Sequence, residues 1–176
     1  MRVFLCFLFS LIFLYSASSQ TITPAGPLDL CPGGNQILTV NGAVAGTTFQ
    51  WQLNAADIPG ATLNTHNATI AGSYTAILTT PGPVKDTLGP VVLVSRPNPV
   101  ATFSFNPNNQ CGNVPVSFLN TSSGTGLSYA WNFGDPASGA NNLSSASQPT
   151  HRFVGNPGNG TQSFTVTLTV TSVYGC

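Results

Sequence analysis

Short runs of alternating apolar and polar residues recur along most of the chain, separated by glycine and proline. In the first half, Phe49, Trp51 and Leu53 alternate with two glutamines, which places three apolar side chains on one face of a β-strand. Pro-Gly and Asn-Gly dipeptides between such runs are typical of turns. The strands expected in this half cover residues 37–40, 48–53, 62–70, 73–79 and 90–95. Their spacing predicts a β-sandwich.

The second half repeats this pattern after a break. Tyr129, Trp131 and Phe133 fall on alternate positions, and Gly134-Asp135-Pro136 then supplies residues that end a strand in a turn. Further strands are expected over residues 101–105, 114–120 and 163–173. The two halves therefore predict two sandwiches in series.

The break between the halves is Arg96-Pro97-Asn98-Pro99. Two prolines in four residues interrupt any strand and favour a short, stiff linker. We therefore predict a domain over residues 20–96 and a second over residues 97–176.

Residues 1–19 have the features of a secretory signal peptide. Arg2 supplies the positive charge, residues 3–15 are apolar, and Ala17-Ser18-Ser19 offers small residues for cleavage. The alternative is a membrane anchor, but thirteen apolar residues span roughly 20 Å as a helix, short of the roughly 30 Å hydrocarbon core. Secretion or display at the cell surface is expected, with no membrane span in the mature chain.

The composition supports an all-β protein. Only 5% of the residues are charged and glutamate is absent, so long solvent-exposed helices are not expected. Past the predicted leader, three cations, Lys85, Arg96 and Arg152, stand against four aspartates. These scattered cations form no basic patch, which argues against nucleic-acid binding.

Trp51 and Tyr74 give the first sandwich a resemblance to immunoglobulin-like domains. Trp51 lies where such domains carry a core tryptophan on strand C, and Gly72-Ser73-Tyr74 resembles the tyrosine corner that opens strand F. Ala76 stands where an antibody domain has its second cysteine, so the usual disulfide between the sheets is not expected. The region is similar to immunoglobulin-like modules of large secreted proteins of Bacteroidota.

The second sandwich resembles the polycystic-kidney-disease (PKD) domain, an immunoglobulin-like sandwich of extracellular proteins. The resemblance is carried by Trp131, Phe133, Gly134 and Asp135, which match W-x-F-G-D, and by His151 in a following P-x-H-x-[FY]. It implies that these residues form the core and a turn. A sandwich of this family has one more strand after residue 173, so we expect this domain to be incomplete at its C-terminal end.

The resemblance to secreted modules also suggests a disulfide between Cys111 and Cys176. Strand topology argues against it, because the start of strand B and the end of strand F lie at opposite ends of such a sandwich. Both possibilities stay open at this stage. Cys31 is expected to be free or to pair with a residue outside this sequence.

Candidate catalytic and metal-ligating residues are few. The two histidines, His66 and His151, fall in different predicted domains, and a metal site needs three or four converging ligands. Asp135 offers carboxylate oxygens for calcium, but a turn role is favoured. No nucleophile, zinc or phosphate-binding motif is present, so we expect neither an enzyme nor a cofactor.

These features favour a non-catalytic extracellular module, a spacer or adhesive unit within a larger secreted or cell-surface protein. The expected partners are a cell-surface protein or carbohydrate and further domains of the same polypeptide. The alternative is a pair of accessory modules that place a secreted hydrolase on a polysaccharide or protein substrate, with the catalytic domain outside this chain.

Overall fold

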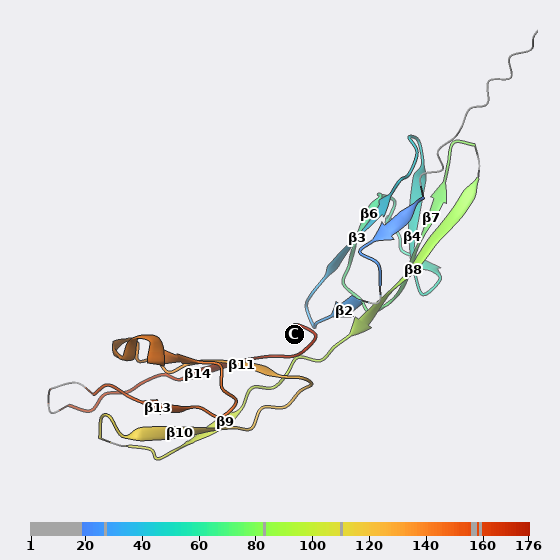
Figure 1. The fold of residues 1–176 in the computed structure, drawn as a ribbon. Helices are drawn as coiled ribbons and strands as arrows, with labels where there is room; N and C mark the ends of the chain where they lie inside the picture. The colour runs from blue at the N-terminus through green and yellow to red at the C-terminus, as the bar shows by residue number, and fades with distance from the viewer. Residues whose placement is uncertain (1–18, 27, 83, 110, 156–157, 159) are drawn as a thin grey trace, which may run out of the picture.

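The computed structural model describes residues 19–176 except 27, 83, 110, 156–157 and 159. Residues 1–18, and with them nearly all of the predicted signal peptide, lie outside the described residues. The chain forms two β-sandwiches that meet at a junction near residue 96, with the C-terminal residues beside β2 of the first sandwich (Figure 1).

The N-terminal sandwich contains eight strands. They are β1 (Thr21–Thr23), β2 (Leu28–Leu30), β3 (Gln36–Asn41), β4 (Thr48–Leu53), β5 (Ala56–Asp57), β6 (Thr65–Ala68), β7 (Gly72–Thr79) and β8 (Lys85–Ser95). One sheet has the order β1-β3-β6, and the other has the order β2-β8-β7-β4-β5. All pairings are antiparallel except that of β2 with β8.

The C-terminal sandwich contains six strands and one 3-10 helix. They are β9 (Phe103–Asn106), β10 (Pro115–Asn120), β11 (Ser128–Asn132), η1 (Pro136–Asn142), β12 (Leu143–Ser144), β13 (Thr150–Arg152) and β14 (Thr167–Thr171). The sheets have the orders β13-β10-β9 and β12-β11-β14.

The two sandwiches share one topology. The order β6-β3-β1 corresponds to β13-β10-β9, and β5-β4-β7 corresponds to β12-β11-β14. In immunoglobulin nomenclature these are strands E, B and A on one sheet and C′, C and F on the other. The predicted all-β fold with two immunoglobulin-like sandwiches is confirmed.

Each sandwich has its own hydrophobic core, built from inward-facing residues of both sheets. The largest buried side chains of the first core are Trp51, Tyr74 and Leu38, with exposures of 1% or less. The second core centres on Trp131, Phe133 and Phe118. Alternation along the strands produces this separation, because every second residue points to the opposing sheet.

The last strand is shorter than the pattern predicts. Apolar residues alternate with threonines from Phe164 to Thr171, yet the ladder covers only Thr167–Thr171. Its partner β11 ends at Asn132, opposite Thr167, where the chain turns away at Gly134. Residues before Thr167 therefore keep an extended alternating sequence without a ladder.

Candidate functional site: the junction between the two sandwiches

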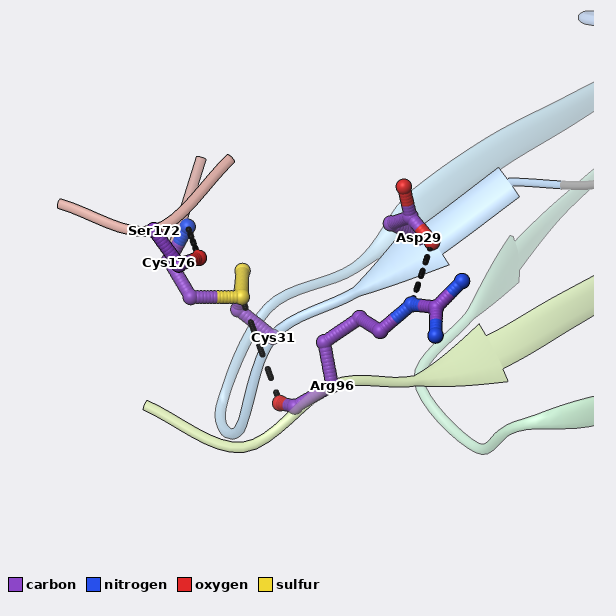
Figure 2. Close-up of a disulfide and its surroundings, with 5 residues drawn as sticks. All are labelled: Asp29, Cys31, Arg96, Ser172 and Cys176. Carbon is purple, nitrogen blue, oxygen red and sulfur yellow. Dashed lines mark hydrogen bonds and ion pairs between the residues drawn. A yellow bond between two sulfur atoms is a disulfide. The ribbon is translucent and has the colours of Figure 1, made fainter. Parts of the chain in front are cut away.

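A disulfide between Cys31 and Cys176 joins the two sandwiches (Figure 2). Their Cα atoms lie 5.4 Å apart, and 145 positions separate them in sequence. Of the two possibilities left open for Cys111 and Cys176, the structure therefore has the one without a bond between them, and the expectation that Cys31 is free or paired outside this sequence is wrong. Cys111 is an exposed free thiol.

The physical reason is the direction of the strands. Cys111 precedes β10, which is antiparallel to β9 and begins at the end of the sandwich away from the junction (Figure 1). Cys176 follows β14, which ends at the junction. The two cysteines thus lie at opposite ends of one sandwich, too far apart for a disulfide.

Strand β2 brings Cys31 to the junction. It pairs in parallel with the last three residues of the β8 ladder, Leu93 to Ser95, and the Arg96 N–H donates to the Leu30 carbonyl at 3.0 Å. Cys31 then begins a tight turn, in which the Gly34 N–H donates to the Cys31 carbonyl at 2.9 Å. Gly33, with a φ of 76°, occupies the position of a type II turn that favours glycine.

A second tight turn fixes Cys176. The Ser172 N–H donates to the Cys176 carbonyl and the Gly175 N–H to the Ser172 carbonyl, both at 2.9 Å. The Cys176 N–H donates to the Ser172 hydroxyl at 3.2 Å, and Ser172 is buried. Hydrogen bonds therefore hold the backbone at both cysteines in addition to the disulfide.

Arg96 connects both sides of the junction. Its Nε donates to Asp29 Oδ1 at 2.6 Å, and its guanidinium carbon lies 4.0 Å from the centre of the Tyr174 ring. Its carbonyl oxygen lies 3.9 Å from the Cys176 sulfur. The hydrogen bond with Asp29 raises the pKa of the Arg96 guanidinium, so its charge persists at every physiological pH.

We call Asp29, Cys31, Arg96, Ser172, Tyr174 and Cys176 the junction clasp. The Asp29 and Arg96 side chains are 38% and 30% exposed, so solvent weakens their ion pair and the disulfide is the stronger tie. Together with the linker that follows Arg96, the clasp holds the sandwiches at two places along the chain. This arrangement restricts rotation of one sandwich about the other.

No site role was predicted for Asp29, Arg96, Ser172 or Tyr174. One usable signal was present, because Arg96 is one of three cations past the predicted leader and stands at the predicted linker between the two domains.

Trp131 and Phe133 lie in the core of the C-terminal sandwich, each 1% exposed. The Trp131 indole N–H donates to the Ala146 carbonyl at 2.9 Å. Phe133 stacks on the His151 ring, with centres 4.2 Å apart and planes at 6°. These side chains are therefore positioned to support the fold and do not face a ligand.

Asp135 and His151 form a buried pair next to that stack. His151 Nε2 lies 3.1 Å from Asp135 Oδ2, which also accepts the Val154 N–H at 2.8 Å. The second carboxylate oxygen of Asp135 is buried with no hydrogen-bond partner among the described residues. Since both side chains are at most 2% exposed, a substrate in solution cannot reach them.

Trp51 holds the position of Trp131 in the N-terminal sandwich, and Tyr74 lies on the neighbouring strand β7. The Trp51 indole N–H donates to the Leu63 carbonyl at 2.9 Å, and the Tyr74 hydroxyl donates to the Ile70 carbonyl at 2.8 Å, the contact of a tyrosine corner. His66 lies between their rings, with centres 5.7 Å and 5.6 Å away, and burial lowers the pKa of His66.

Gly134 offers a test of how the turn after Phe133 is packed. Its φ is 68°, and a Cβ placed there would collide with the Thr165 carbonyl. Gly139 has a similar φ of 61° but open space around the added atom. We expect Gly134→Ala to lower the free energy of unfolding by about 2–4 kcal/mol. Gly139→Ala should cost only about 1–2 kcal/mol, from backbone strain. Urea denaturation of both variants measures the difference, and equal losses would contradict the packing at Thr165.

Metal and membrane features were also sought. In residues 19–176 with their gaps, no three His, Cys, Asp or Glu side chains converge into a group that could hold a metal ion. No helix in that part of the chain has the length and apolar content needed to cross a bilayer.

The chain was compared with known proteins. None of the protein-family models and none of the curated protein sequences matches it. Among solved structures it is similar to the three N-terminal domains of the highly immunogenic outer capsid protein (Hoc) of bacteriophage RB49, with 13% identity, a TM-score of 0.44 and 89% of this chain covered. It is also similar to the amphioxus IgVJ-C2 molecule, with 10% identity, a TM-score of 0.34, and coverage of 83% of this chain and all of the other.

The chain spans 56% of the length of the phage structure. We draw nothing about function from either similarity, and the fold assignment above depends on the strand pairing alone.

Proposed function

We propose that the chain is a non-catalytic extracellular spacer module that holds two immunoglobulin-like sandwiches in one relative orientation. The observation that carries the proposal is the Cys31–Cys176 disulfide, which joins the sandwiches through residues far apart in sequence. A linker alone leaves tandem domains free to rotate. A covalent bond at the junction is useful where a defined distance or angle between neighbouring domains matters.

The disulfide also supports the proposed location, secreted or at the cell surface. Disulfides form and persist in oxidising compartments, and the leader-like residues 1–19 would direct the chain there. A buried Asp135–His151 pair is compatible with a PKD-type C-terminal domain, and we keep that family and a Bacteroidota surface protein as part of the proposal. The partners proposed are a cell-surface protein or carbohydrate and neighbouring domains of the same polypeptide.

Small-angle X-ray scattering of the oxidised chain and of Cys31→Ser/Cys176→Ser tests the spacer role. We expect one interdomain orientation to fit the oxidised chain, because the clasp removes rotation at the linker. The scattering curve of the double variant should require a broad set of interdomain orientations, and its mean radius of gyration should be larger.

Cys111→Ser is the matched control, since it removes a thiol that bonds to nothing in the junction. It should scatter like the oxidised wild type. If the oxidised wild type itself needs the same breadth of orientations as the double variant, the spacer proposal fails.

A further inference from the structure

We infer that the Cys31–Cys176 disulfide makes the module nearly inextensible under tension, because it gives force a covalent route that bypasses both sandwiches. The inference rests on the proposed spacer role, and the load that the spacer would resist is tension along the chain. It depends on the order of the two cysteines along the chain.

Cys31 lies near the start of the described residues and Cys176 at their end, 145 positions later. Force applied at Gln20 and at Cys176 travels along the backbone to Cys31, crosses the sulfur–sulfur bond and leaves through Cys176. Residues 32–175 lie inside the loop that this bond closes. Unfolding the parts of either sandwich that lie inside this loop therefore releases no length between the two points of attachment.

Among the strands that the structure describes, β1 and β2 alone precede Cys31 and so carry the force directly. Each is three residues long, and they detach from β3 and β8 respectively. Residues 20–31 extend to about 40 Å at most, whereas the closed loop of 145 positions holds about 500 Å of chain. The oxidised module can thus lengthen by less than a tenth of the length that the reduced module releases.

Most core residues of both sandwiches also lie inside the loop that the disulfide closes. Of the buried residues in the N-terminal core, Ile22 and Leu30 precede Cys31, and the others, including Trp51, lie inside the loop. Every buried residue of the C-terminal core lies inside it. Detachment of β1 and β2 therefore exposes two core side chains and leaves both tryptophans under no direct tension.

Single-molecule force spectroscopy tests the inference, with handles attached at Gln20 and after Cys176. The oxidised chain should lengthen by no more than about 40 Å. After reduction by dithiothreitol, which is itself oxidised to its cyclic disulfide while Cys31 and Cys176 become thiols, about 500 Å more should appear in unfolding steps. Cys31→Ser/Cys176→Ser should behave like the reduced chain without any reductant.

Two further outcomes would overturn the inference. If the oxidised wild type lengthens as much as the reduced chain, the bond does not carry the force. If the oxidised chain extends fully except for about 230 Å, which appears only after reduction, Cys176 is paired with Cys111, 65 positions away. Cys111→Ser is the control, and it should leave the oxidised trace unchanged.

The force and scattering experiments separate the two proposals. A full release of length by the oxidised chain together with one orientation in scattering would overturn the force inference and leave the spacer role in place. If the oxidised chain lengthens by no more than about 40 Å but scattering requires a broad set of orientations, the spacer role is overturned and the force inference stays in place.

Discussion

Trp131→Ala is expected to destabilise the C-terminal sandwich strongly while the N-terminal sandwich keeps its stability. The side chain is 1% exposed and lies between Phe103 and Phe118, whose ring centres are 5.0 Å and 5.6 Å away. Truncation leaves a cavity and an unpaired Ala146 carbonyl, and we expect a loss of about 3–5 kcal/mol. Small domains have a total stability of about 5–15 kcal/mol, so this loss removes a large share of it.

Hydrogen exchange measured by mass spectrometry distinguishes the sandwiches. In Trp131→Ala the amides of β10 and β11 should lose protection, whereas those of β4 and β7 should keep it. The chain has two tryptophans, one in each core, so the remaining fluorescence reports on Trp51 and should stay blue-shifted.

Trp51→Ala is the matched control, because Trp51 is fully buried and its indole N–H also donates to a carbonyl at 2.9 Å. It should produce the mirror image, with protection lost in β4 and β7 and retained in β10 and β11. Full protection of β10 and β11 in Trp131→Ala would show that Trp131 does not support that core.

The fold was accessible from the sequence because the strands carry their own periodicity. Alternation at Trp51 and at Trp131 identifies strand C in each sandwich, and the turn residues between runs limit the strands. Short strands without alternation were not predicted. Strand β2 has only three residues, and its pairing with β8 is a contact between segments more than 60 positions apart, which local pattern does not encode.

The disulfide was missed for the same reason. The direction of strands B and F that separates Cys111 from Cys176 also places the start of strand B of the first sandwich and the end of strand F of the second at the junction. Cys31 and Cys176 occupy those two positions. The pairing could have been predicted by extending the topological argument across the linker, but it required two domains to be considered together.

The chemistry of the clasp was less accessible. Arg96 and Asp29 are 67 positions apart, and their contact follows from the pairing of β2 with β8. Tyr174 belongs to the other sandwich, so its contact with Arg96 depends on how the domains dock. Asp135 and His151, in contrast, belong to motifs within one domain. Sequence alone placed both in a structural role, and the buried contact between them required coordinates.

Asp135→Ala is expected to destabilise the C-terminal sandwich by about 3–5 kcal/mol, because it breaks a buried pair by removing one partner. The carboxylate accepts the Val154 N–H at 2.8 Å and contacts His151 Nε2 at 3.1 Å, in a site with exposures of 1% and 2%. After truncation, the Val154 N–H loses its acceptor and the buried His151 ring loses its polar partner. Urea denaturation followed through hydrogen exchange of β10 and β13 measures the loss.

Two matched substitutions isolate the cause. Asp135→Asn keeps the size and one acceptor oxygen, so it should cost only about 1–2 kcal/mol. Asp57→Ala removes an exposed carboxylate that accepts one hydrogen bond from Gln52, and it should change the stability by less than about 0.5 kcal/mol. If Asp135→Ala costs no more than Asp57→Ala, the buried pair adds nothing to stability. The expected order, with Asp135→Ala well above Asp135→Asn, follows because Asp135→Asn keeps an acceptor oxygen for the Val154 N–H.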